Sequence, residues 1–288
     1  MNSADLHLHT NFSDGTYTPE ELTGRARQLG LAAVALTDHD TVEGCTRMAA
    51  ACAAAGLEFI PATELTAEFD DNELHLLGYF VDTGNQTLLT EMVRFQKVRQ
   101  DRVREMVARL NQLNIPLEAD AVFALASCRS PGRPHVARAL VMGRFCSSPD
   151  EAFERFLKKN RPAWVPKFKI SALDAIALIH QAGGLAVMAH PGLNRTDGII
   201  PDLVEAGLDG LECFHTKHTP STSEHYVRIA KEFNLAITGG SDCHGLSKGK
   251  PLIGTVRLPY EYVEQLQARS RSKRSRAPAP RPALRAPH

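Results

Sequence analysis

The stretch ADLHLHTNFSDGTYTPEELTGRARQLGLAAVALT, residues 4–37, decides the fold class. It places two apolar segments, residues 4–9 and 32–37, on either side of a helix-start signature. Thr18 is a good N-cap, and Glu21 completes a capping box within the first turn. The uninterrupted apolar run 32–37 is typical of a parallel strand that is covered on both faces. The stretch therefore predicts a strand, a helix and a second strand in succession.

The same alternation recurs further along the chain. Apolar strand candidates follow at residues 58–63, 73–80, 185–190, 208–213 and 235–242. Seven predicted strands with intervening helices favour an α/β fold, a seven-stranded β/α barrel of distorted TIM-like form. Residues 253–258 would add an eighth strand or an edge piece. The alternative is an open doubly wound sheet, but no glycine-rich dinucleotide fingerprint follows the first strand.

A helical pattern interrupts this alternation over residues 84–164. Apolar residues recur at helical spacing from Val103 to Leu110, with charged residues between them. The pattern predicts a helical insertion, and we expect this insertion to serve as a substrate cap. It would separate two segments of one barrel, residues 1–83 and 165–268.

The composition is that of a globular protein with a core of its own. The chain has 288 residues, of which 43% are hydrophobic and 23% are charged. No stretch approaches the roughly 18 apolar residues that span a bilayer, and no signal-peptide pattern opens the chain, so we expect a cytoplasmic location. The six cysteines are scattered without a Cys-x-x-Cys pair, which favours reduced thiols.

Charge is unevenly distributed along the chain. Residues 269–288 contain seven of the 33 Lys and Arg residues and none of the 33 Asp and Glu residues, so residues 1–268 carry a net charge of about −7. An acidic body suits a site that holds cations. The C-terminal segment has four prolines and little apolar content, which predicts a disordered basic tail over residues 269–288. Electrostatic contact with RNA is the alternative to a solvated, dispensable tail.

Nine ligand-type side chains fall at or near predicted strand ends. They are His7, His9, Asp14, His39, Glu64, His75, His190, Asp242 and His244. In a parallel barrel the C-terminal strand ends face one mouth, so we expect these side chains at one place. A single histidine is more often structural than a ligand, but the convergence of so many predicts a metal centre. Asp40 is left out of the set, because it could simply cap the following helix.

The chemistry of this set points to divalent metal ions. Imidazole and carboxylate groups without thiolates suit Zn²⁺, Mn²⁺ and Fe²⁺. Nine candidate ligands exceed what one ion needs, so we expect two or three ions with open positions. Ions about 3.5–4 Å apart can hold a bridging hydroxide that attacks a phosphoryl group in line. The residues therefore predict a metal-dependent phosphoesterase without an organic cofactor.

Four segments resemble the motifs of the polymerase and histidinol phosphatase (PHP) family: DLHLHTNFSDG (5–15), ALTDHDTVEG (35–44), GLAVMAHPG (184–192) and GGSDCHG (239–245). The resemblance implies a seven-stranded PHP barrel with a trinuclear site that usually holds Mn²⁺, with Zn²⁺, Fe²⁺ or Mg²⁺ as alternatives. It implies one ion on His7, His9, Glu64 and Asp242, a second that Glu64 bridges to His75 and His190, and a third on Asp14, His39 and His244.

The helical insertion is similar to that of family members that dephosphorylate 3′,5′-nucleoside bisphosphates or degrade short RNA and ribosomal RNA precursors from the 5′ end. In SPGRPHVARAL (130–140), Arg133 and His135 match an Arg-x-His phosphate contact, and the planar fork of Arg133 suits bidentate phosphate binding. The resemblance implies nucleoside bisphosphates and RNA 5′ ends as substrates. Neither a membrane nor an obligate protein partner is indicated.

Two further histidines lie in ECFHTKHTP (212–220). His218 matches a position that commonly carries histidine near the substrate. We therefore expect it to contact the substrate and to act in catalysis together with Glu64 and Asp242. His215 has no such match and is expected to be structural.

Two rival functions remain open at this point. A histidinol-phosphate phosphatase would share the metal motifs, but the Arg-x-His segment fits a nucleotide better. A non-catalytic regulatory module that kept the barrel should have lost metal ligands, and all nine are present.

Overall fold

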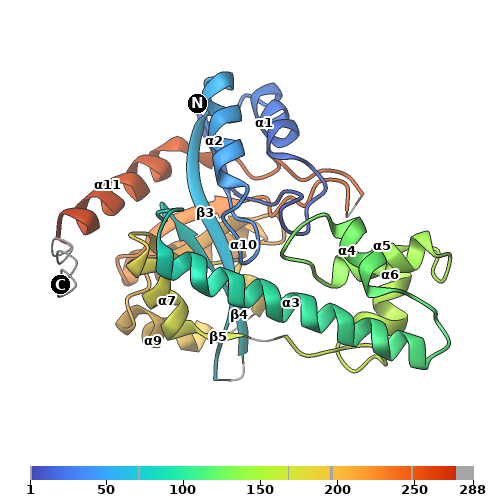
Figure 1. The fold of residues 1–288 in the computed structure, drawn as a ribbon. Coiled ribbons are helices and arrows are strands. Elements are labelled where there is room, and N and C mark those ends of the chain that lie inside the picture. Colours follow the sequence, from blue (N-terminus) through green and yellow to red (C-terminus); the bar gives the residue numbers. More distant parts are fainter. Residues whose placement is uncertain (1, 71, 168, 195–196, 248, 277–288) are drawn as a thin grey trace, which may run out of the picture.

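The computed structural model covers residues 1–288 and describes all of them except residues 1, 71, 168, 195–196, 248 and 277–288. Seven strands form a nearly closed barrel, as the sequence predicts (Figure 1). In sheet order they are β1 (Ser3–Leu8), β2 (Ala33–Leu36), β3 (Glu58–Phe69), β4 (Asn72–Tyr79), β6 (Leu185–Met188), β7 (Gly210–His215) and β8 (Ala236–Gly240). Two short strands extend the sheet: β5 (Ile170–Ser171) pairs with β3, and β9 (Leu258–Pro259) pairs with β1. The predicted eighth strand is therefore an edge piece.

The barrel closes where β1 passes β8. The backbone N–H of Ser241 donates to Asp5 Oδ1 at 2.8 Å, and Leu8 forms a parallel bridge with Cys243. Gly240 lies so close to β1 that a Cβ atom on it would meet the backbone nitrogen of His7 at 2.3 Å. Only glycine permits this approach, so the closure fixes the strand that carries the His-x-His pair.

The strand directions differ from the expected parallel barrel at one place. β4 runs antiparallel to both β3 and β6. β3 continues beyond Thr63, its predicted end, and pairs Phe69 with Asn72 across a hairpin that is too short for a crossover helix. Glu64 therefore lies within β3 rather than at its end, and His75 lies in the first half of β4.

Helices cover the outside of the barrel. They are α1 (Pro19–Gln28), α2 (Cys45–Ala55), α7 (Ala172–Gln181), α8 (Pro191–Asn194), the 3₁₀ turn η2 (Asp197–Ile199), α9 (Ile200–Glu205), α10 (Pro220–Glu232) and α11 (Tyr260–Arg276). The predicted capping box of α1 is confirmed, because Thr18 and Glu21 each accept a hydrogen bond from the other's backbone N–H. No helix in the described part of the chain is both long and apolar enough to cross a bilayer.

The helical insertion is present, but its first helix packs partly against the barrel and partly against the rest of the insertion. Its elements are α3 (Gln86–Gln112), α4 (Ala119–Ala126), α5 (Arg133–Met142), α6 (Pro149–Ala152) and the π-helical turn η1 (Phe153–Leu157). In the first half of α3, Leu88 and Met92 pack into the barrel's main core. From Val103 onward the helix packs with α4 and α5 around a separate core. Figure 1 shows α3 running along the barrel and carrying α4, α5 and α6 at its far end.

The prediction of a disordered tail from residue 269 is wrong for its first eight residues. α11 continues to Arg276 and buries Ser270 against the barrel. Its basic side chains have specific partners: Lys273 Nζ lies 2.7 Å from both carboxylate oxygens of Asp209, and Arg269 donates to the carbonyl of Asn234 at 2.7 Å. Composition alone missed these distant partners. The remainder of the predicted tail, residues 277–288, lies outside the described residues.

Candidate metal centre

Glu64 is the centre of a histidine cluster at the mouth of the barrel. Its side chain is 1% exposed, and its two oxygens lie 2.7–3.3 Å from ring nitrogens of five histidines: His7, His9, His39, His75 and His190. These histidines come from β1, β4 and the segments that follow β1, β2 and β6. The antiparallel hairpin of β3 and β4 brings Glu64 and His75 into contact. The predicted direction of β4 was wrong, but both side chains still lie at the mouth of the barrel.

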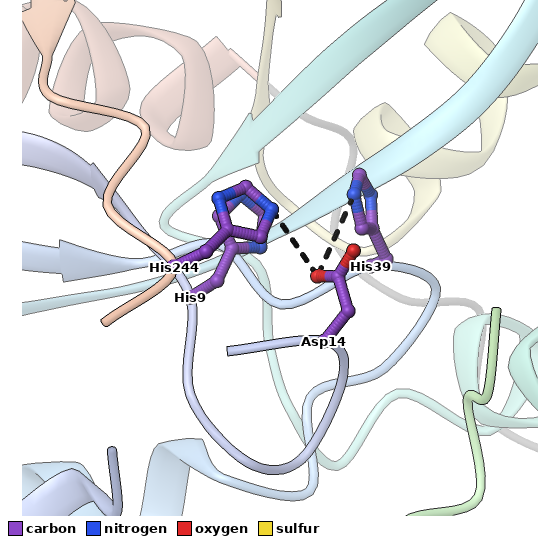
Figure 2. Close-up of side chains that lie close together, drawn as sticks. All are labelled: His9, Asp14, His39 and His244. Carbon is purple, nitrogen blue, oxygen red and sulfur yellow. Dashed lines mark ion pairs between the residues drawn. The ribbon is translucent and has the colours of Figure 1, made fainter. Parts of the chain in front are cut away.

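Eight of the nine predicted ligands fall into three overlapping groups whose ligand atoms all lie within 4.8 Å of one another. The groups are His9, Asp14, His39 and His244; His7, His9 and Asp242; and His39, Glu64 and His75. Figure 2 shows the first group, in which Asp14 Oδ1 lies 3.2 Å from His244 Nε2 and 3.9 Å from His39 Nε2. His190, the ninth residue, reaches the cluster through Glu64. The structure thus brings all nine predicted residues together.

Unpartnered polar atoms show that this cluster fits metal ions. Buried polar atoms in folded proteins are nearly always hydrogen-bonded. Among the nine predicted ligands, seven buried atoms make no hydrogen bond with any described residue: His7 Nε2, His9 Nδ1, His9 Nε2, Asp14 Oδ1, His39 Nδ1, Glu64 Oε2 and His190 Nδ1. His244 Nδ1 donates to the carbonyl of Asp242 at 2.9 Å, which leaves the lone pair on Nε2 free for a ligand bond. These free nitrogen lone pairs and carboxylate oxygens are suitable ligands for divalent cations.

The electrostatics of the cluster also favour cations. Burial alone would raise the pKa of Glu64, but His39, His75 and His7 hold it well below its usual range. Asp14 and Asp242 have pKa values lowered in the same way against burial, with His244 as the strongest contributor in both cases. The three carboxylates are therefore ionised at neutral pH and lie together in a buried site.

Sequence analysis missed two buried carboxylates that orient the cluster. Asp38 accepts from the backbone N–H of Thr10 at 2.7 Å and from the hydroxyl of Ser13 at 2.6 Å, so it fixes the loop that carries Asp14. Glu212, in β7, accepts hydrogen bonds from the cluster itself. A signal existed in the sequence, because each is an acid within or directly after an otherwise apolar strand.

His215 is the last residue of β7, and His218 follows it by three residues. Both ring nitrogens of His218 are used by the backbone: Nδ1 donates to the carbonyl of Cys213 at 3.0 Å, and Nε2 accepts from Gly192 N–H at 3.2 Å. These two contacts attach His218 to the loop after His190, and its expected substrate contact and catalytic role stay a prediction. His215, expected to be structural, lies in the cluster with a fully buried side chain and Nε2 3.7 Å from Asp242 Oδ2.

Asp40 does not cap the following helix, since Gly44 is the N-cap of α2. Asp40 instead lies 2.5 Å from Arg99 Nε of α3 and accepts a 3.4 Å hydrogen bond from the backbone N–H of Thr66. A second contact supports the same junction, because Ser130 donates to the carbonyl of His39 at 2.6 Å. These contacts fasten the insertion to the mouth of the barrel.

A cavity of about 720 Å³ separates the cluster from the insertion. Its floor includes Asp14, His39, Glu64, His75, His190, Asp242 and His244. Its other walls carry one acid, Asp150, and five cations: Arg99, Arg102, Arg133, Arg138 and Lys167. A site that binds cations therefore faces a wall that suits anions, and a phosphate ester between them would meet positive charge from both sides.

The two predicted phosphate contacts differ in their placement. Arg133, at the start of α5, lines the cavity with its guanidinium 5.8 Å from the ring centroid of Phe153. His135 is fully buried, and its Nδ1 accepts from the backbone N–H of Gly132 at 3.0 Å. Its Nε2 has no hydrogen-bond partner among the described residues. Contact of His135 with a substrate phosphate remains a prediction.

Fold and site together define a metal-dependent phosphoesterase of the barrel type. Residues 5–157 match the PHP domain family, and the chain belongs to that family. A 5′-3′ exoribonuclease of Haemophilus influenzae is 34% identical over 83% of this chain and 89% of its own length. A 3′,5′-nucleoside bisphosphate phosphatase of Chromobacterium violaceum is 32% identical over 88% of this chain and 91% of its own length.

A solved structure shares the whole architecture, insertion included. The crystal structure of a protein from Bifidobacterium adolescentis, described as a metal-dependent phosphoesterase, superimposes with a TM-score of 0.86 at 35% identity. The match covers 93% of this chain and 96% of that chain. The barrel and the helical insertion are therefore one shared architecture.

Proposed function

We propose that this phosphoesterase removes the 3′-phosphate from 3′,5′-nucleoside bisphosphates and degrades RNA from the 5′ end. The main support for the proposal is that one cavity has the candidate metal ligands on its floor and Arg and Lys side chains in the wall opposite that floor. A substrate with one phosphate has no use for both surfaces. A nucleotide with a phosphate on each side of its ribose engages both.

The floor would hold two or three divalent ions, for which Mn²⁺ is the expected metal. His7, His9 and Asp242 form one ligand group; Asp14, His39 and His244 form another with His9; Glu64 connects them and reaches His75 and His190. Ions bound by these residues supply an activated water and neutralise charge on a phosphoryl group. The chain itself orients the substrate, because Arg133 can bind the phosphate that is not cleaved.

One geometry serves both proposed substrates. In a 3′,5′-bisphosphate and in the first nucleotide of a 5′-phosphorylated RNA, the 5′-phosphate stays and the bond between phosphorus and the 3′ oxygen is broken. An RNA differs only in what continues beyond the scissile phosphate. The cavity volume of about 720 Å³ lies within the usual range for small-molecule sites and accepts one nucleotide with room beyond it.

The test is a direct contest between substrates. Protein loaded with Mn²⁺ would be given adenosine 3′,5′-bisphosphate, a short 5′-phosphorylated RNA, the same RNA with a 5′-hydroxyl, and histidinol phosphate. We expect the first two to be hydrolysed fastest, with release of 5′-mononucleotides from the RNA. A higher kcat/KM for histidinol phosphate than for either would overturn the proposal.

A further inference from the structure

Arg102 is a buried cation in the wall of the cavity, and no carboxylate of a described residue lies within ion-pair distance of it. It projects from α3, is 8% exposed, and lines the cavity opposite the histidine cluster. Its Nε donates to the carbonyl of Val165 at 2.9 Å, which fixes the side chain in place. Its Nη2 is buried and makes no hydrogen bond within the described part of the chain. Burying a guanidinium that lacks an anionic partner costs free energy, and a bound anion would offset this cost.

Two of the five cations in the cavity wall form ion pairs, and the other three, Arg102, Arg133 and Arg138, have none within the described residues. Arg99 pairs with Asp40 at 2.5 Å, and Lys167 pairs with Glu73 at 2.8 Å. Among the described residues, neither Arg102 nor Arg133 forms an ion pair. Burial is the largest cause that lowers the pKa of Arg102 to about 9, and the charges of Arg133 and Arg99 act in the same direction. The more distant carboxylates of Glu73 and Glu105 oppose this shift without cancelling it, so the guanidiniums are close enough to repel one another.

We propose that Arg102 and Arg133 together bind the substrate's 5′-phosphate, the one that is not hydrolysed, and that Arg102 thereby determines selectivity for bisphosphates. The inference rests on the proposed function and adds a residue from a second helix to its phosphate site. A phosphate dianion carries two negative charges and can therefore serve as the anionic partner of both guanidiniums. It would also give Nη2 of Arg102 an acceptor and remove the repulsion between the two side chains.

A purely structural role for Arg102 makes a different prediction. A void of about 20 Å³ beside Arg102, lined also by Asp40 and Lys167, has room for one water molecule that could bond to its guanidinium. If that were the whole role, replacing Arg102 would lower stability and leave the preference for a 5′-phosphate unchanged.

The experiment compares two substrates with the same scissile bond, adenosine 3′,5′-bisphosphate and adenosine 3′-monophosphate. The ratio of their kcat/KM values measures the contribution of the 5′-phosphate. We expect Arg102→Met to lower that ratio by roughly 10- to 100-fold, the range for a lost charge-assisted hydrogen bond. Lys97→Ala is the matched control, because Lys97 is a cation on the same helix that is 73% exposed and does not line the cavity. This control should keep the wild-type ratio.

A second readout needs neither metal nor turnover. Binding of adenosine 5′-monophosphate and of adenosine to metal-free protein, measured by calorimetry, isolates the same phosphate. Arg102→Met should lose the extra affinity for the monophosphate by a similar factor, and the double variant with Arg133→Met should lose less than the sum of the two single losses. If Arg102→Met folds poorly, Arg102→Gln can still donate to the Val165 carbonyl but lacks the charge.

The outcomes separate the two proposals. A folded Arg102 variant with the wild-type ratio and the wild-type affinity for adenosine 5′-monophosphate overturns the inference. If the wild-type protein hydrolyses neither nucleotide, the proposed function fails. The binding comparison then still decides whether Arg102 forms an anion site.

Discussion

Glu212 Oε1 lies 2.9 Å from His7 Nδ1, and both side chains are fully buried. The second carboxylate oxygen accepts from the backbone N–H of His190 at 2.7 Å. His190 has a φ of +30°, a strained conformation for a residue other than glycine, and the contact with Glu212 holds it there. Glu212 thus keeps the proton of His7 on Nδ1 and turns Nε2 toward Glu64. It positions two candidate ligands without lying among them.

We therefore predict that Glu212→Gln weakens metal binding by about 10- to 100-fold, the usual cost of losing a group that orients a ligand. Competition with a chelator of known affinity, read by elemental analysis, measures the change. Glu232→Gln, at the exposed end of α10, is the control and should bind metal normally. Wild-type metal affinity in folded Glu212→Gln would rule out the positioning role.

Glu64→Gln should nearly abolish turnover. The amide has the same shape but lacks the charge that five surrounding histidines and bound cations require. We expect kcat to fall by more than about 100-fold, beyond the range for a residue that only supports ligands. Circular dichroism should show an intact fold. A metal-loaded, folded variant with a kcat close to wild type would contradict the central role of Glu64.

Removal of divalent ions should destabilise the protein as well as inactivate it. Ions that bind the folded state stabilise it by mass action, and here they would complete buried atoms that otherwise have no partner. A chelator should lower Tm, and added Mn²⁺ should restore both Tm and phosphate release. Protein that keeps full activity after exhaustive chelation, with elemental analysis showing no transition metal, would exclude the metal centre.

Residues 269–276, the last turns of α11, should contribute to the stability of the fold and not to the rate of hydrolysis. Truncation after Arg276 should leave Tm unchanged. Truncation after Ala268 removes Lys273 and Arg269 with their contacts to Asp209 and Asn234, and should lower Tm by more than about 2–4 °C. Scanning calorimetry of both truncations checks this. Equal Tm values would mean that the last turns of α11 add nothing.

The contact between Lys273 and Asp209 also predicts a dependence on pH. Burial opposes ionisation of Asp209, but hydrogen bonds from His180 and Lys273 lower its pKa below the usual value. A carboxyl with a lowered pKa stabilises the fold above its unfolded pKa of about 3.9 and loses that contribution as the pH falls through its folded pKa. The Tm difference between wild type and Lys273→Met should be constant above about pH 5 and shrink below about pH 4.

The sequence predicted which side chains converge at the mouth of the barrel better than it predicted their surroundings, for physical reasons. Period-two spacing and strand ends suffice to bring His7 and His9 to the mouth, and this holds even where a neighbouring strand is reversed. Spacing does not reveal which way a ring faces, so it could not predict that both ring nitrogens of His218 contact the backbone. Nor does composition reveal a distant partner, so it predicts a disordered tail where a helix pairs Lys273 with Asp209.

Arg133 should set substrate choice rather than the ability to hydrolyse. It lies at the start of α5 in the insertion, outside the ligand groups, and faces the cavity. Arg133→Ala should lower the ratio of kcat/KM for adenosine 3′,5′-bisphosphate to that for adenosine 3′-monophosphate by roughly 10- to 100-fold. Arg133→Lys should recover only part of the loss, because a point charge cannot reproduce the planar fork.

The ratio within one variant is the decisive quantity, since it cancels any general damage to the enzyme. If Arg133→Ala loses activity equally on both substrates, the guanidinium contacts the scissile phosphate or holds the insertion in place. Its stacking against Phe153 makes the second outcome measurable as a lower Tm. An equal loss would remove the main reason for preferring nucleoside bisphosphates. A collapse of the ratio at unchanged Tm would identify the 5′-phosphate as the group that the insertion recognises.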